Sequence, residues 1–409
     1  MSSIAAGPRA ASRMTAAERR ATACLAGVSG LRMLGLFIVL PVLALHAESL
    51  PGGGDPALIG IAIGAYGLAQ ALLQIPFGWA SDRVGRKPAI AAGLAVFAAG
   101  SFVAAWAPTL PWLIAGRAIQ GAGAVSAAVM ALAADLTRDE VRTRTMAAIG
   151  ITIGAAFAVS LVAGPVLAGA IGVPGVFVLT GALACTAIAV VLWGIPQAPS
   201  TVHTADRAGF VRALADGQLL RLDLGVFVLH AVMSALFLQM PFALRDAGIP
   251  AERHWTVYLP VLVVAVAVVM PLFRAVDRPE RSRIVLLSAI GTLVVSLVVL
   301  AFAGGSLTAL VAGLAVFFAA FTLLEAALPS MVTRFAPRAA RGTAIGVYSG
   351  MQFLGMFVGA ATAGVILKHA GATAVYLAGA LLTLLWLAAG ATMTNPPASP
   401  DSPLSIGRT

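Results

Sequence analysis

Only one acidic side chain, that of Glu325, lies well inside an apolar stretch of this sequence. The other fifteen aspartates and glutamates lie in polar segments or at the ends of apolar runs. If such a stretch crosses a bilayer, a charge at its centre costs at least about 2.5 kcal/mol, so the residue usually faces a cavity, forms an ion pair or carries a proton. We therefore expect Glu325 to bind a proton, with a structural hydrogen-bond or ion-pair role in the C-terminal half as the alternative.

Two arginines and one histidine also interrupt apolar runs. Arg32 and Arg117 lie in the N-terminal half, where no mid-membrane carboxylate can neutralise them. We expect each to touch cavity water, a backbone carbonyl or an anionic group of a substrate and to take part in proton coupling, or else to be structural. His230 could relay protons because an unperturbed imidazole titrates near pH 6.5, although a lone histidine on an apolar helix is more often a packing residue. Further polar candidates for a cavity wall are Gln70, Gln74, Tyr348 and Gln352.

A short charged loop separates the second and third apolar runs. It spans residues 78–87, and its candidate gating residues are Gly78, Asp82, Arg83, Gly85, Arg86 and Lys87. A connection this short between two membrane segments must lie at the membrane surface, where Gly85 permits a turn and Gly78 a close approach of helices. Asp135 ends the fourth apolar run on the same face, so we expect an ion pair between Arg86 and Asp135. The alternative is that these charges only set the membrane topology.

The composition indicates an integral membrane protein. Hydrophobic residues make up 60% of the chain and charged residues 10%, and the mean hydropathy is +0.97. A soluble protein of this length could not stay dispersed with that composition. The sequence contains no GxxxxGK[ST] phosphate loop, no HExxH or CxxC motif and no credible Ser, His and Asp set. We therefore expect no enzymatic activity, no metal site and no cofactor, with a proton gradient as the energy source.

Twelve apolar runs are each long enough to cross a bilayer as a helix, which takes about 20 residues. They are continuous, whereas the strands of a membrane barrel alternate polar and apolar residues over about ten positions. The fold class predicted is therefore an all-α membrane protein. The expected spans are residues 22–46, 57–80, 89–107, 110–134, 145–170, 173–194, 222–244, 255–274, 284–303, 307–331, 342–367 and 373–393.

The distribution of basic residues predicts the topology, because lysine and arginine are retained on the cytoplasmic side of a membrane. With both termini cytoplasmic, 21 of the 26 basic residues lie in tails or inner loops of a multi-pass protein of the cell membrane, in a bacterium the inner membrane. The net charge of +10 is then a topology signal, and no nucleic-acid partner is expected. The expected parts are a cytoplasmic N-terminal tail (1–21), a six-helix bundle (22–194), a cytoplasmic linker (195–221), a second six-helix bundle (222–393) and a disordered cytoplasmic tail (394–409).

The two halves are similar to each other in sequence. Residues 148–150 and Gly154 recur 196 positions later as residues 344–346 and Gly350, and the charged loop has a weaker copy at Asp277, Arg278 and Arg281. Parallel six-helix repeats are typical of transporters whose substrate path lies between the halves. Glycine pairs four residues apart share a helix face and are expected to serve static packing or sliding contacts. These pairs are Gly60 and Gly64, Gly150 and Gly154, Gly346 and Gly350, and Gly355 and Gly359.

Four motifs, two of them partial, resemble those of the major facilitator superfamily, in particular its twelve-helix drug-efflux branch. Residues 78–87 match the whole pattern of Gly, three residues, Asp, Arg, any residue, Gly, Arg, Lys. Residues 117–123 (RAIQGAG) resemble the motif whose arginine is associated with proton coupling. Residues 34–44 resemble a helix 1 motif whose final proline is replaced here by Ala44. The antiporter motif of helix 5 is partial: Gly164, Pro165 and Gly169 are present, but Ser160 and Ala168 replace glycines. Residues 22–393 are also similar to the YajR group of proton-driven efflux proteins.

The resemblance implies two pseudo-symmetric six-helix bundles that alternate access to a central site. It also implies that Asp82 faces the start of helix 11, near Gly342 and Thr343, when the cytoplasmic side is closed. We therefore predict a monomeric secondary transporter that exports small, drug-like molecules in exchange for protons. The alternatives are a proton-coupled importer of a sugar or other metabolite, and a membrane sensor that uses the same fold without transport.

Overall fold

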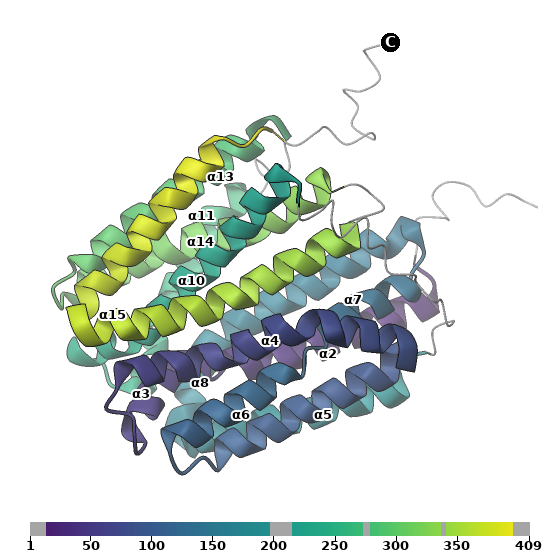
Figure 1. Ribbon diagram of the computed structural model, residues 1–409, viewed down its shortest axis with the longest axis horizontal. Coiled ribbons are helices and arrows are strands. Elements are labelled where there is room, and N and C mark those ends of the chain that lie inside the picture. Colours follow the sequence, from purple (N-terminus) through teal and green to yellow (C-terminus); the bar gives the residue numbers. More distant parts are fainter. Residues whose placement is uncertain (1–13, 197–214, 273–278, 337–340, 396–409) are drawn as a thin grey trace, which may run out of the picture.

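The computed structural model describes residues 14–196, 215–272, 279–336 and 341–395, and its regular elements in these ranges are all helices (Figure 1). The N-terminal bundle consists of α2 (Ala16–Phe37), α3 (Leu40–Ser49), α4 (Pro56–Val84), α5 (Arg86–Ala105), α6 (Leu110–Ala122), α7 (Ser126–Asp135), α8 (Asp139–Ala189) and the π-helical turn η1 (Val190–Gly194). The C-terminal bundle consists of α10 (Gly217–Asp246), η2 (Ala251–Arg253), α11 (Trp255–Val269), η3 (Met270–Leu272), α13 (Pro279–Ala301), α14 (Leu307–Phe335) and α15 (Arg341–Ala391).

These helices supply the twelve membrane crossings that the sequence predicts. Ten stretches of the described residues are long and apolar enough to cross a membrane. Two of them are 55 and 50 residues long, one formed by α8 with η1 and the other by α15; they turn sharply at Gly172 (φ 71°) and Gly371 (φ 80°), so each crosses twice. Both glycines adopt a left-handed conformation that favours glycine. The α8 and α15 turns are at corresponding places in the two halves.

Two predicted spans are broken within the membrane. The first consists of α2 and α3, separated at residues 38–39, and the fourth consists of α6 and α7, separated at residues 123–125. The first span begins at Ala16, six residues before the expected start, because Thr15 and Glu18 form a reciprocal capping box there. The expected linker lies largely outside the described residues, and so do Asp277 and Arg278 of the weaker loop copy.

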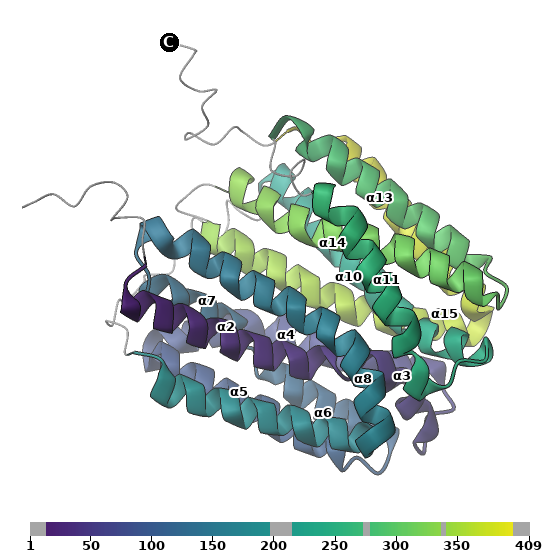
Figure 2. The same cartoon turned by 180° about the vertical axis from the view of Figure 1, so that it is seen from behind.

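The two bundles lie side by side, with the start of α2 and the end of α15 at one end of the molecule (Figures 1 and 2). We call this the terminus end and the opposite end the far end. A buried cluster towards the terminus end, from Leu25 to Ile195, contains only residues of the N-terminal bundle. The larger buried cluster joins residues of both bundles. The bundles are therefore packed together towards the far end, whereas the N-terminal bundle has a core of its own towards the terminus end.

Candidate functional site

Glu325 lies beside His230 in the middle of the C-terminal bundle. Oε2 of Glu325, on α14, is 3.7 Å from Nε2 of His230, on α10. The amide nitrogen of Gln352, on α15, is 2.8 Å from the same Nε2, and Nδ1 of His230 is 3.1 Å from the carbonyl oxygen of Val226. Because a carbonyl oxygen only accepts, Nδ1 carries the proton here, and Nε2 of a neutral imidazole accepts from Gln352. Nε2 is therefore the atom that can exchange a proton with Glu325.

Two more polar groups of the C-terminal bundle lie near this pair. The hydroxyl of Tyr348 is buried without a hydrogen-bond partner and within electrostatic reach of Glu325 and Asp223. The sequence places Asp223 at the very start of a span, but α10 begins earlier, at Gly217, and Asp223 is only 5% exposed. Asp223 is therefore a buried acid close to the start of α10, which the sequence prediction did not single out. Asp223 was missed because a charged residue at 221 and another at 223 resemble a helix boundary.

Arg32 is the centre of a polar network in the N-terminal bundle. Its side chain is buried, and its Nη1 atom donates to the hydroxyl of Ser126 at 2.6 Å. Its Nη2 atom donates to the hydroxyl of Tyr66 at 2.8 Å and to Oε1 of Gln70 at 3.0 Å. Gln70 in turn donates to Gln74 at 2.8 Å. The structure thus brings Gln70 and Gln74, predicted as cavity residues, into one hydrogen-bonded chain with Arg32.

Tyr66 connects Arg32 to the second buried arginine. The guanidinium carbon of Arg117 lies 5.2 Å from the centre of the Tyr66 ring, and Nη1 of Arg117 donates to Oε1 of Gln120. A cation over an aromatic face is attracted by the electron-rich ring. Among the described residues, neither arginine forms an ion pair with a carboxylate. The sequence reasoning missed Tyr66, although its spacing of four from Gln70 places the two on one helix face.

A cluster of phenylalanines joins the two bundles between these polar groups and the far end. Phe157 of α8 contacts Phe37 of α2, with ring centres 5.0 Å apart, and Phe321 of α14, with ring centres 5.9 Å apart. Phe321 also packs against His230, with ring centres 5.9 Å apart. Phe237 and Phe318 extend the cluster. These rings fill the interface with apolar area between the polar centre and the far end.

The far end is closed by ion pairs between the bundles. Lys368 of α15 donates to Asp55, the N-cap of α4, at 2.8 Å, and Arg245 of α10 lies 2.5 Å from Glu48 of α3. The hydrogen bond from Lys368 lowers the pKa of Asp55 from its usual value. Close backbone packing accompanies these pairs, because a Cβ atom at Gly60 would collide with the carbonyl oxygen of Ala360.

The charged loop lies at the terminus end and its contacts stay within the N-terminal bundle. Nε of Arg86 is 3.3 Å from Asp135, the pair expected from the sequence, and its Nη1 atom is 2.5 Å from Asp82 and 2.7 Å from the Ser81 hydroxyl. Asp82 is expected to face α15 near Gly342 when the cytoplasmic side is closed. In this structure a Cβ atom at Gly342 would have nothing within 4 Å, so the start of α15 stands free there.

The other loop residues have local roles. Lys87 donates to the carbonyl oxygens of Leu192, at 3.1 Å, and Ile195, at 2.7 Å. These bonds connect the end of the sixth crossing to the charged loop. Gly85 has φ +96° and makes the turn. Arg83 is exposed. A Cβ atom at Gly78 would meet only Ala127, at 3.9 Å, so no close helix approach depends on Gly78 in this state.

The helix 5 motif lies where the fifth crossing meets the break of the first. A Cβ atom at Gly164 would collide with the carbonyl oxygen of Ile38, and Pro165 follows within α8. Gly169 faces the side chain of Glu252, so that a Cβ atom there would come within 2.9 Å of Glu252 Cγ. The motif thus contacts both the neighbouring helix of its own bundle and the opposite bundle.

No group of three or more His, Cys, Asp or Glu side chains in the described part of the chain could hold a metal ion. The remaining features are those of a membrane transporter. Two six-crossing bundles are bridged by ion pairs at the far end, and buried arginine and histidine side chains lie inside them. A fold of this kind positions a central site between two halves.

Comparisons with known proteins agree with this class. The sequence profile of the Major Facilitator Superfamily matches residues 25–274 and 222–407. The chain is 44% identical over 391 residues to the inner membrane transport protein YajR of Escherichia coli (strain K12), covering 94% of this chain and 86% of that one. It is 27% identical over 334 residues to the multidrug resistance protein MdtH of Aeromonas hydrophila, covering 81% and 82% of the two chains.

A solved structure supports the fold. A bacterial homologue of the human lysosomal transporter Spinster, in an inward-facing and occupied conformation, superimposes with a TM-score of 0.73 at 14% identity, over 95% of this chain and all of that one. The chain belongs to the Major Facilitator Superfamily. It is a multi-pass membrane transporter and not an enzyme.

Proposed function

We propose that this protein is a proton-coupled exporter of small molecules that works by alternating access. The observation that carries the proposal is the pair of Glu325 and His230, two titratable groups 3.7 Å apart on α14 and α10 of the C-terminal bundle. The Glu325 side chain is 41% exposed, whereas that of His230 is 4% exposed. A proton can therefore reach the exposed part of the Glu325 side chain and be shared with Nε2 of His230.

Glycine contacts support a rocking movement of the two bundles. At the far end, Gly60 and Gly64 of α4 pack closely against Ala360 and Phe357 of α15. Their counterparts Gly150, Gly154, Gly346 and Gly350 have nothing within 4 Å of an added Cβ atom. Smooth glycine faces let backbones approach closely in membranes. We infer that these free faces meet the opposite bundle when the terminus end closes and the far end opens.

The terminus end is assigned to the cytoplasm, so that the present state is open to the inside. The support is the positive-inside rule, because 21 of the 26 basic residues lie on that side or in its tails. The partial helix 1 motif, residues 34–44, and the partial helix 5 motif favour export. The name of the E. coli relative indicates transport at the inner membrane, and that of the MdtH relative indicates multidrug resistance.

Flux measurements in proteoliposomes with an imposed pH gradient test the proposal. The purified full-length protein is given a panel of labelled drugs, sugars and organic acids, with empty liposomes as control. Substrate flux opposite to the proton flux supports export by antiport. Flux in the same direction as the protons would indicate an importer, and absence of flux across the panel would favour a sensor; either result contradicts the proposal.

A further inference from the structure

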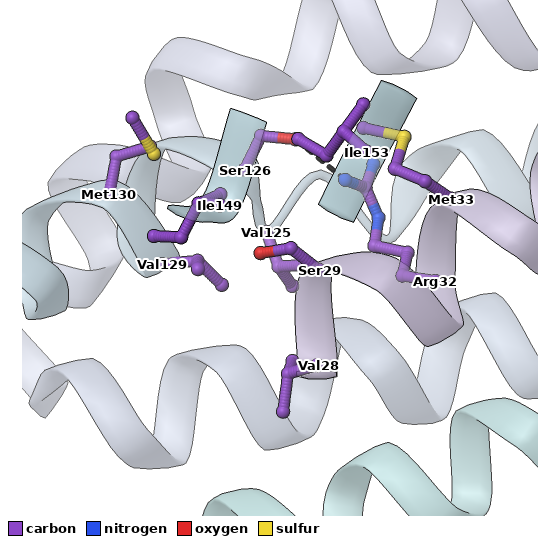
Figure 3. A pocket seen from close by; sticks show the side chains of 10 residues that line it. All are labelled: Val28, Ser29, Arg32, Met33, Val125, Ser126, Val129, Met130, Ile149 and Ile153. Atoms are coloured by element: carbon purple, nitrogen blue, oxygen red, sulfur yellow. Dashed lines mark hydrogen bonds between the residues drawn. The ribbon is translucent and has the colours of Figure 1, made fainter. Parts of the chain in front are cut away.

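A small cavity in the N-terminal bundle contains a single charged side chain. Its volume is about 40 Å³, and it lies where α2, α7 and α8 meet (Figure 3). The polar part of its wall consists of Ser29, Arg32 and Ser126, whereas Met33, Met130 and Ile153 are among its apolar residues. Arg32 is therefore the only formal charge facing this cavity.

Among the residues that the structure describes, no carboxylate pairs with Arg32. Its hydrogen-bond acceptors are the neutral groups of Ser126, Tyr66 and Gln70. Its Nε atom has no hydrogen-bond partner among the described residues, although the arginine is only 3% exposed. A guanidinium group stays protonated in proteins, so it cannot relieve its burial by losing a proton. Arg117 adds a second positive charge on the other side of Tyr66. A water molecule could fill the cavity but could not neutralise these charges.

The break in the fourth crossing adds a second feature that favours an anion. α7 begins at Ser126, beside Arg32, and its N-cap is the apolar Val125, which makes no side-chain capping bond. The first backbone N–H groups of an α-helix have no partner within the helix and carry the positive end of its dipole. Val125 and Ser126 both line the cavity. The start of a ten-residue helix therefore meets the cavity at the same place as the unpaired guanidinium.

We infer that this cavity binds the anionic head group of the transported substrate, and that the substrate class is an amphipathic organic anion such as a carboxylate or sulfonate. The inference rests on the proposed function, because it names the class of compound that the transporter carries. Arg32 and the start of α7 bind the head group, and Met33, Met130 and Ile153 contact the apolar part. Charge-assisted hydrogen bonds of this kind are roughly twice as strong as neutral ones. A cation, by contrast, would have to bury its charge beside Arg32.

The test measures binding of four probes. Octanoate, octanol and octyltrimethylammonium share an eight-carbon chain, and inorganic phosphate lacks it. The full-length protein in lipid nanodiscs is dialysed against each labelled probe, with empty nanodiscs subtracted. Octanoate should bind to the wild type at least about tenfold more tightly than octanol or octyltrimethylammonium. Arg32→Gln should weaken octanoate binding by at least about tenfold. Arg32→Lys should restore part of it, and Arg253→Gln, which removes an exposed arginine, should have no effect.

Three results would overturn the inference that the cavity binds an amphipathic anion. They are equal binding of octyltrimethylammonium and octanoate, unchanged octanoate affinity in Arg32→Gln, and displacement of octanoate by phosphate at equal concentration. The comparison of probes on the wild type decides the matter even if Arg32→Gln does not fold. Proton-driven flux of a cationic drug, without any binding of octanoate, would support the proposed function and contradict this inference. Octanoate binding that needs Arg32, without any proton-driven flux, would support the anion site and contradict the proposed function.

Discussion

Lys368, in the eleventh crossing, reaches across the molecule to Asp55 at the start of the second crossing, with 2.8 Å between Nζ and Oδ2. The two residues are 313 positions apart in sequence and belong to different bundles. This contact and the pair of Glu48 and Arg245 bridge the bundles at the end where the helices are packed together. They must separate when the far end opens, so they set part of the balance between the two states.

Glu48→Gln should favour the state that is open at the far end. Exposed ion pairs contribute at most about 1 kcal/mol, so the ratio of the two states should change by up to about fivefold. Spin labels on opposite bundles at the far end would measure this ratio as two distance populations. The matched control is Glu280→Gln, an exposed acid at the start of α13. An equal change in both variants would remove the far-end pair from the account.

The pH dependence of the far-end closure follows from Asp55. Because Lys368 lowers the pKa of this carboxyl, the contact is fully present above the pKa of the unpaired group and is lost as the pH falls through the lowered value. Titration of Asp55 should therefore leave the distance populations unchanged between about pH 5 and pH 8. Asp55→Asn should abolish the opening that appears in stronger acid. A large change of the populations with pH near neutrality that disappears in Asp55→Asn would contradict the pairing.

Gly60→Ala should hinder closure of the far end. The added Cβ atom would collide with a backbone carbonyl of Ala360, which cannot move aside as a flexible side chain could. We expect slower transport and a larger population open at the far end, measured by alkylation of a single cysteine placed there. Gly291→Ala is the control, because its Cβ atom would meet nothing within 4 Å. Gly346→Ala should shift the population the other way if its face meets the opposite bundle in the second state.

Asp82→Asn should impair transport while leaving the amount of protein in the membrane unchanged. The carboxylate shares Arg86 with Asp135 in this structure, and the resemblance to the family implies that it faces the start of α15 when the cytoplasmic side is closed. Transport by Glu140→Gln, which changes an exposed acid at the same end, is expected to stay near the wild-type rate. Normal transport by Asp82→Asn would show that the loop charges serve topology alone.

Much of this architecture can be predicted from apolar runs, because a membrane crossing needs a fixed length of apolar sequence. The breaks in the first and fourth crossings cannot be predicted in that way, since residues 38–39 and 123–125 are as apolar as their neighbours. The pairing of Arg86 with Asp135 follows from topology, as both residues lie at ends of crossings on one face. Tyr66 and Asp223 were missed for different reasons. A tyrosine in an apolar run attracts no notice, and Asp223 seemed to mark a helix end.

The contact of Glu325 with His230 depends on how three helices from distant parts of the sequence pack. Hydrophobic periodicity shows which residues are buried but not which polar groups meet. Only the folded bundle places Gln352 on the same imidazole nitrogen that faces Glu325. The sequence could therefore nominate the proton site but not its partner.

The most direct test of the account compares proton-driven flux with substrate exchange at equal pH in the wild type and Glu325→Gln. Both are measured in the same proteoliposome preparations, with Glu280→Gln as the charge-matched control. We predict that Glu325→Gln loses at least about tenfold of the flux driven by a pH gradient, the range expected when a proton-transfer group is removed, and retains exchange. Equal proton-driven flux in the wild type and Glu325→Gln would contradict the assignment of Glu325 as the coupling site.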